Sequence, residues 1–213
     1  SADRLFTGDE ELLWHLAPSI TRADDDLPLS GLISNARRLW EDHEIPVPKP
    51  DGEVRILFLG DSCTFGAKLG YRDTYVEQVK EMLSASVTEG HSIECINAGV
   101  PGYTLFQGWR YLESEGYHYQ PDAVVLYFGW NELASWGNRG DLEHYEALRS
   151  AQPPAGLRWS RVCQLVWQLA NAPASAGIVE PPQIAVQRPR LRHDEFADLL
   201  ARVAESTPRE GVD

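Results

Sequence analysis

The chain has 213 residues, of which 43% are hydrophobic and 24% are charged, a balance that is ordinary for one globular α/β domain. The formal net charge of −13 argues against nucleic acid as a partner, because binding to phosphates needs a basic surface. No apolar stretch reaches the length needed to span a membrane. The chain has three cysteines, Cys63, Cys95 and Cys163. Their odd number and wide spacing argue against a disulfide framework or a zinc site. We expect no metal and no cofactor.

Residues 1–50 precede the first predicted core strand. We expect them to form an N-terminal extension that packs on the outside of the core, and residues 51–213 to form a single α/β domain. The extension contains two short Trp-bearing pieces, Leu12-Leu13-Trp14 and Arg37-Arg38-Leu39-Trp40. The acidic run at 24–26 between them is typical of a solvated loop.

Three apolar runs predict the strands of the core. Residues 54–59 form an unbroken run, as expected of a strand buried on both faces in a parallel sheet. Residues 92–97 predict the second strand, and 123–128 predict a third buried strand. Amphipathic helices are expected between them, over 74–84 and from Leu105 to Leu112. The spacing of about thirty residues between strands is that of a βαβ unit, so we expect a three-layer α/β/α fold with a flavodoxin-like parallel sheet.

The pattern changes in the last third of the chain. Residues 158–170 and 194–203 predict helices, and 171–189 predict a long loop rich in Pro and Ala. No fourth or fifth apolar strand follows. We therefore expect the α/β fold to be incomplete at the C-terminus of the chain.

Small and polar residues follow each predicted strand. They are Gly60-Asp61-Ser62, the turn from Asn97 to Thr104, and Gly129-Trp130-Asn131-Glu132. Because the carboxyl ends of parallel strands share one edge, these groups are expected to converge where α/β sheets bind ligands. A Ser at that edge lies near a helix N-terminus, and an Asn can donate its amide there. Taken singly, each also fits an ordinary turn or helix cap.

Together these three blocks resemble the SGNH (GDSL-type) hydrolase family over about residues 54–132. The resemblance implies that Ser62 is the nucleophile. It also implies an oxyanion hole made by the backbone N–H groups of Ser62 and Gly102 and the amide of Asn131. Gly102, rather than Gly99, corresponds to the glycine of the family's second block, because that block has an Asn, then four residues, then the Gly, and Asn97 precedes Gly102 at this spacing. Glu132 stands where the family usually has Asp.

The family takes its base from a late Asp-x-x-His block, and this sequence ends before one. The literal match is Asp141-Leu142-Glu143-His144, so His144 is the candidate base and Asp141 its orienter. This match begins only ten residues past Asn131, whereas the family's block comes much later in the chain, so we interpret it as a coincidence. His193 is a weaker candidate at a predicted helix start, and Cys63 is an alternative nucleophile beside Ser62. The remaining histidines are expected to be surface or packing residues: His15, His43, His91 and His118.

The resemblance implies a serine hydrolase that acts on small or carbohydrate O-acyl esters through an acyl-enzyme on Ser62. Trp130 and Asp61 are candidate substrate-binding residues, because Trp stacks well on sugar faces, although a Trp is more often a packing residue. Three alternatives are an O-acyltransferase, a non-catalytic binding module that lacks the base, and a nucleotide binder using loop 60–66. The last is disfavoured because this loop up to Gly66 has no basic residue and carries Asp61, which repels phosphate.

Similar families are often exported, so an exported or periplasmic location is favoured over a cytoplasmic one. The sequence makes no prediction of oligomeric state.

Overall fold

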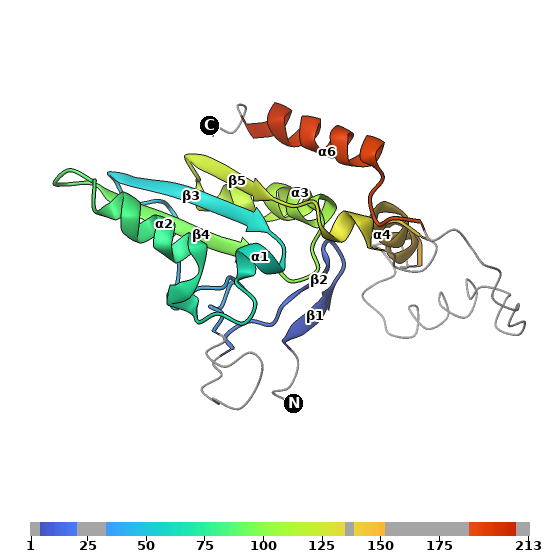
Figure 1. The fold of residues 1–213 in the computed structure, drawn as a ribbon, viewed down its shortest axis with the longest axis horizontal. Coiled ribbons are helices and arrows are strands. Elements are labelled where there is room, and N and C mark those ends of the chain that lie inside the picture. The colour runs from blue at the N-terminus through green and yellow to red at the C-terminus, as the bar shows by residue number, and fades with distance from the viewer. Residues whose placement is uncertain (1–4, 21–32, 135–138, 152–187, 208–213) are drawn as a thin grey trace, which may run out of the picture.

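The structure is a computed structural model that describes four stretches of the chain: residues 5–20, 33–134, 139–151 and 188–207. At its centre is a three-stranded parallel sheet with the strand order β4–β3–β5. Its strands are β3 (Glu53–Gly60), β4 (Ser92–Gly99) and β5 (Ala123–Tyr127). The chain crosses between them through two helices, α2 (Tyr75–Ser84) and α3 (Leu105–Ser114), so the predicted strands and helices of this region are confirmed (Figure 1).

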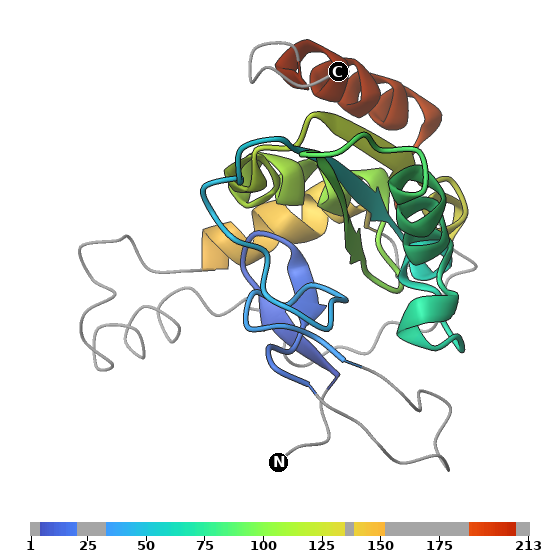
Figure 2. The same cartoon turned by 90° about the vertical axis from the view of Figure 1, so that its left-hand side faces the viewer.

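The two crossover helices lie on opposite faces of the sheet (Figures 1 and 2). Successive side chains of β3 alternate between these faces. Phe58 packs with Val76 of α2, whereas Leu57 and Leu59 pack in a second cluster with Leu112 of α3. This arrangement confirms the expected α/β/α layers.

Strand β5 differs from the buried strand that its apolar run predicts. Val125 is 37% exposed and Tyr127 is 55% exposed. Val125 pairs in register with Phe58, so it lies on the face that carries α2, while Val124 and Leu126 pack towards α3. The expectation is wrong because β5 is an edge strand of the described sheet. An apolar run alone does not distinguish an edge strand from a central one.

The N-terminal segment begins with an antiparallel hairpin of β1 (Phe6–Asp9) and β2 (Leu13–Leu16). The Asp9 carboxylate caps its turn by accepting the backbone N–H groups of Glu11 and Leu12. Side chains after the hairpin are also more deeply buried than the sequence predicts. Trp40, for example, belongs to the same buried cluster as Leu57 of β3. Several residues of the segment thus form part of the main core instead of packing outside it: Leu12, Leu16, Leu39 and Trp40.

Two described helices follow the sheet, α4 (Asp141–Ala151) and α6 (His193–Ser206). The predicted helix at 194–203 is thereby confirmed, and its Leu199 packs with Phe106 of α3. The predicted helix at 158–170 and nearly all of the predicted loop at 171–189 lie outside the described residues. Within the described parts of the chain, no helix is long and apolar enough to cross a membrane.

A short helix, α1 (Ser62–Phe65), follows β3 and packs closely against the end of β4. A Cβ atom on Gly99 would lie 2.4 Å from the backbone nitrogen of Phe65 and 2.8 Å from the carbonyl carbon of Thr64. The Asn97 amide donates to the Thr64 carbonyl oxygen at 3.0 Å. The missing side chain of Gly99 therefore lets α1 approach the end of β4, and the hydrogen bond from Asn97 holds the helix there.

A polar cluster ties the N-terminal segment to β4. Glu41 accepts the Asn97 backbone N–H at 2.6 Å and the Tyr71 hydroxyl at 2.5 Å. Burial raises the pKa of Glu41 from its usual value of 4.5 to about 8. The hydrogen bond to Glu94 raises the pKa of His43 from 6.5 to about 9.

We predict that Gly99→Ala lowers the free energy of unfolding by about 1–3 kcal/mol, because the added methyl group meets the backbone of α1. Urea denaturation measures this loss. Gly8→Ala is the matched control, since a Cβ there meets no atom within 4 Å, and it should change stability by about 0.5 kcal/mol or less. Equal effects of the two substitutions would contradict the close packing of α1.

The polar cluster predicts how stability depends on pH. Folding raises the pKa of both groups, so each contributes stability at low pH that is lost as the pH rises through about 8 for Glu41 and about 9 for His43. The free energy of unfolding should therefore fall between pH 6 and pH 9.5, as measured by urea denaturation over about that range.

The double variant Glu41→Gln, His43→Asn should show a shallower decline, because neither new side chain titrates. Gln keeps an acceptor for the Asn97 N–H. A decline as steep as that of the unchanged chain would show that other groups cause it.

Candidate active site

Ser62 is the first residue of α1 and lies just past the carboxyl end of β3. Asp61 caps this helix, and its Oδ1 atom accepts the Cys63 N–H at 2.8 Å. The Asp61 side chain is buried, whereas Ser62 is half-buried and Cys63 is exposed. The turn thus presents the Ser at the edge of the sheet where α/β folds bind ligands.

Asn131 begins a short 3₁₀ helix, η3 (Asn131–Leu133), after β5. Its amide nitrogen Nδ2 donates to the carbonyl oxygen of Tyr103 at 2.9 Å and to Oδ2 of Asp61 at 3.3 Å. Tyr103 follows Gly102, and Asp61 precedes Ser62. A single carboxamide therefore joins the three turns that follow the strands.

Glu132 links two of these regions through its carboxylate. Its oxygens accept the backbone N–H of Leu105, the first residue of α3, and that of Gly129, each at 2.9 Å. The side chain is buried. A Glu at this position thus connects the turn after β5 to the start of α3.

Two side chains for which the sequence predicted no role in the site contact the Gly102 turn. The Trp14 indole of β2 donates to the Pro101 carbonyl oxygen at 3.2 Å, and Arg190 donates to the Gly102 carbonyl oxygen at 2.5 Å. Both lie more than eighty positions from this turn in the sequence. No motif or spacing connects them to it.

Asp141 lies at the start of α4, and its carboxylate is completely buried. Both oxygens accept from the Arg190 guanidinium at 2.9 Å, and one also accepts the Thr104 hydroxyl at 2.6 Å. These bonds connect Asp141 to the Gly102 turn through Arg190, whereas the sequence predicts that Asp141 orients His144. His144 is half-buried in the same helix and donates its backbone N–H to Gly140.

The other histidines lie in distinct environments. His15 is buried and accepts the Leu16 N–H, and burial lowers its pKa to about 4. His43 binds carboxylates of the polar cluster. His91 and His118 come shortly before β4 and β5, at the amino-terminal edge of the sheet, which is opposite to the edge that carries Ser62.

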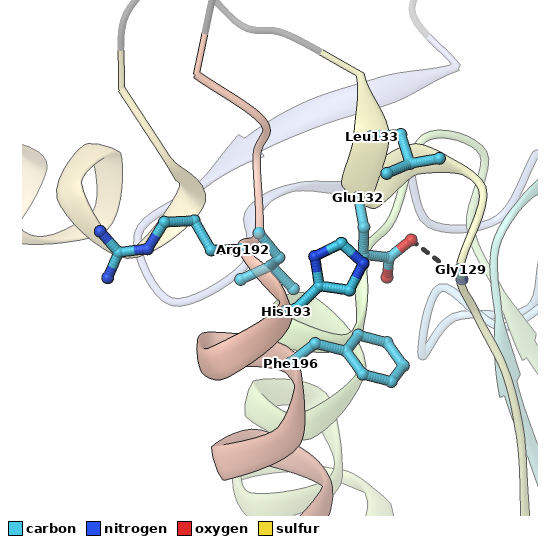
Figure 3. A pocket seen from close by; sticks show the side chains of 7 residues that line it. Gly129, Glu132, Leu133, Arg192, His193 and Phe196 are labelled. Atoms are coloured by element: carbon cyan, nitrogen blue, oxygen red, sulfur yellow. Dashed lines mark hydrogen bonds between the residues drawn. The ribbon is translucent and has the colours of Figure 1, made fainter.

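His193 lines a pocket of about 240 Å³ between the Asn131 turn and α6 (Figure 3). Glu132 and Phe196 also line it, and the dashed line marks the bond from the Gly129 N–H to Glu132. Ser62, Gly102 and Asn131 are not among the residues that line this pocket. It therefore lies beside the converging turns rather than at Ser62.

Aromatic side chains lie along the edge next to α1. Trp130 is 82% exposed, and Tyr127 is exposed at the end of β5. The rings of Tyr127 and Tyr75 lie 6.3 Å apart, and the Tyr75 hydroxyl is 3.0 Å from Oγ1 of Thr64 in α1. Trp130 is thus solvent-facing rather than a packing residue. Tyr127 and Tyr75 form a separate ring pair that reaches α1 through Thr64.

The structure also bears on Cys63 as an alternative nucleophile. Desolvation, and then the neighbouring Asp61 carboxylate, raise the pKa of the Cys63 thiol above its usual value. A raised pKa lowers the fraction of thiolate, which is the reactive form. This environment disfavours Cys63 as the reacting group.

Among the described residues, Glu41, His43 and Glu94 form a group whose ligand atoms lie within 4.8 Å of one another. Their oxygens already accept hydrogen bonds, Glu41 from Tyr71 and Glu94 from Lys80. We interpret the group as an ion-pair network.

The model of the GDSL-like lipase/acylhydrolase family matches residues 58–213. No curated protein matches the chain at a significant level.

Two solved structures illustrate the similarity. The crystal structure of TesA is 23% identical and covers 71% of this chain and 73% of its own, with a TM-score of 0.34. AlinE4, described as an SGNH-hydrolase family esterase, is 17% identical and covers 76% of this chain and 98% of its own, with a TM-score of 0.33. The assignment rests on the family model, which spans most of the chain and includes all three turns. The chain belongs to the GDSL-like lipase/acylhydrolase family.

Proposed function

We propose that the chain is a serine acyl-ester hydrolase in which Ser62 forms the acyl-enzyme. The observation that supports this proposal most directly is the pair of hydrogen bonds made by Asn131, one to Asp61 beside Ser62 and one to Tyr103 beside Gly102. These bonds support the convergence, at one edge of the sheet, of a nucleophilic hydroxyl with the backbone and carboxamide donors that ester cleavage needs.

In the proposed mechanism, the Ser62 hydroxyl oxygen attacks the ester carbonyl and its proton passes to a general base. The oxyanion that forms accepts the N–H groups of Ser62 and Gly102 and the amide of Asn131. The 3.3 Å contact from Asn131 to Asp61 is long for a charge-assisted hydrogen bond. The oxyanion would replace this contact at small cost, while the shorter bond to Tyr103 keeps the amide in place. The alcohol then leaves, and water releases the acyl group.

The general base decides between two candidate functions. Because the Asp141 carboxylate is held by Arg190 and Thr104, it is poorly placed to orient His144 as a base. This observation favours, as the second candidate, a non-catalytic module that binds its ligand at the same sheet edge. Reaction with a fluorophosphonate separates the two functions, since only an activated Ser forms the adduct.

For the substrate we propose a small or carbohydrate O-acyl ester. The exposure of Trp130 and Tyr127 supports this proposal. Tyr127 pairs with Gly60 at the end of β3, and Trp130 directly precedes Asn131, so both follow strands at the edge that carries Ser62, where a flat aromatic ring can stack on the apolar face of a sugar. Asp61 contributes by capping α1 and by holding the Asn131 amide before substrate binds.

We predict that a fluorophosphonate labels Ser62, and that Ser62→Ala abolishes both the label and ester hydrolysis. Asn131→Ala should lower kcat by about 10²–10³-fold, the usual cost of one oxyanion donor. Mass spectrometry locates the adduct, and initial rates with p-nitrophenyl acetate give kcat. Cys63→Ala is the control and should retain activity.

An adduct on Cys63, or full activity in Ser62→Ala, would overturn the assignment of the nucleophile. An unlabelled Ser62 together with saturable ester binding would favour the binding module. In the same assay His144→Ala should retain most activity, because Asp141 is bound elsewhere. A loss as large as that of Ser62→Ala would identify His144 as the base.

The aromatic edge gives a separate prediction about substrate. Trp130→Ala and Tyr127→Ala should each raise KM for an O-acetylated sugar by about 3–10-fold, equivalent to the loss of about one stacking interaction. KM for p-nitrophenyl acetate should change less, as steady-state kinetics with both substrates would show. Leu133→Ala is the matched control, because Leu133 is 69% exposed in the same turn but has no ring. Equal changes for the two substrates would exclude a sugar-binding role.

A further inference from the structure

We infer that Trp14, from the N-terminal hairpin, is a positioning residue that aims the Gly102 N–H at the developing oxyanion. The inference rests on the proposed function, because it gives a role to an oxyanion donor. It concerns a residue outside the three motif blocks and outside the residues that the family model matches.

Three successive carbonyl oxygens of the Gly102 turn each accept a hydrogen bond from a side chain of a different part of the chain. They are Pro101 O from Trp14 Nε1 at 3.2 Å, Gly102 O from Arg190 Nη1 at 2.5 Å, and Tyr103 O from Asn131 Nδ2 at 2.9 Å. Each of these three peptides therefore has a tertiary contact that constrains its orientation.

The contact of Trp14 acts on the peptide that matters for catalysis. The Pro101 carbonyl and the Gly102 N–H belong to one planar peptide group, so a bond to the carbonyl fixes the direction of the N–H. The same bond polarises the peptide and strengthens its N–H as a donor. Gly102 has φ of +84°, and the Tyr103 N–H donates to the Val100 carbonyl oxygen at 3.1 Å across the turn. β-turns closed by such a bond occur with either orientation of their central peptide, which here joins Pro101 to Gly102. The bond from Trp14 opposes a flip of this peptide and so keeps its N–H aimed.

Trp14 is itself held firmly enough to act as that restraint. Its backbone carbonyl accepts the Tyr103 hydroxyl at 2.7 Å, and the two rings meet edge to face with centroids 5.7 Å apart. A Cβ atom on Gly102 would lie 3.2 Å from Cζ2 of Trp14, so the indole packs directly against this glycine.

Arg190 restrains the other side of the same glycine. It donates to the Gly102 carbonyl, which belongs to the next peptide, and its guanidinium lies 5.2 Å from the centre of the Trp14 ring. The buried carboxylate of Asp141 fixes the direction of this guanidinium through two hydrogen bonds. Trp14 and Arg190 thus bind the carbonyl groups of the two peptides that flank Gly102, and they also contact each other through a cation–π interaction.

The test is Trp14→Phe, which keeps an aromatic ring against Gly102 and removes the indole N–H. We expect kcat for ester hydrolysis to fall about tenfold with KM within about twofold, because a misdirected donor weakens only the transition state. The amide proton resonance of Gly102 should move upfield in the NMR spectrum as its peptide loses polarisation. Trp109→Phe, a half-buried Trp of α3, is the matched control and should change neither quantity.

The outcomes separate this inference from the proposed function. If the unchanged chain neither hydrolyses esters nor forms an adduct at Ser62, the proposed function fails and the inference fails with it. If the unchanged chain is active but Trp14→Phe has the same kcat, only the inference fails, whether or not the Gly102 resonance moves. A fall in kcat with an unmoved Gly102 resonance would also overturn it, since Trp14 would then act by another route.

Discussion

The two hydrogen bonds of the Asn131 amide join segments that lie far apart in the sequence, and the arrangement of the candidate site depends on them. One bond reaches the turn that carries Ser62 and the other reaches the turn that carries Gly102. The parallel sheet brings the three strand ends within reach, but side-chain contacts decide how the turns face one another.

A buried ion pair provides the second level of support. Arg190 and Asp141 are both almost fully inaccessible to solvent, and burying two charges costs more than their attraction recovers unless further hydrogen bonds satisfy them. Here Thr104 supplies one such bond to Asp141, and the Gly102 carbonyl accepts one from Arg190. The pair thus connects the residues before α6 to the start of α3. Its charges serve to orient a backbone turn, and removing either partner would leave the other charge uncompensated.

The elements of the core could be predicted because local patterns encode them. The unbroken apolar run at 54–59, the turn chemistry at Gly60-Asp61-Ser62 and the helical spacing in 74–84 each depend on neighbouring residues alone. The same reasoning missed the hairpin of β1 and β2, whose four-residue strands are too short to show an alternating pattern. It also took β5 for a buried strand, because the apolar content of a strand does not show how many neighbours the strand has.

The sequence by itself determined the order of the strands and helices, the turns expected to meet at the carboxyl edge, and the family that those turns resemble. Only the tertiary structure decided which distant side chains hold those turns. Trp14 and Arg190 meet at Gly102 from opposite ends of the chain, and Asp141 binds Arg190 although an Asp-x-x-His spacing pairs it with His144. Contacts of this kind depend on how packed layers bring remote segments together, and that information is not contained in the spacing of residues along the chain.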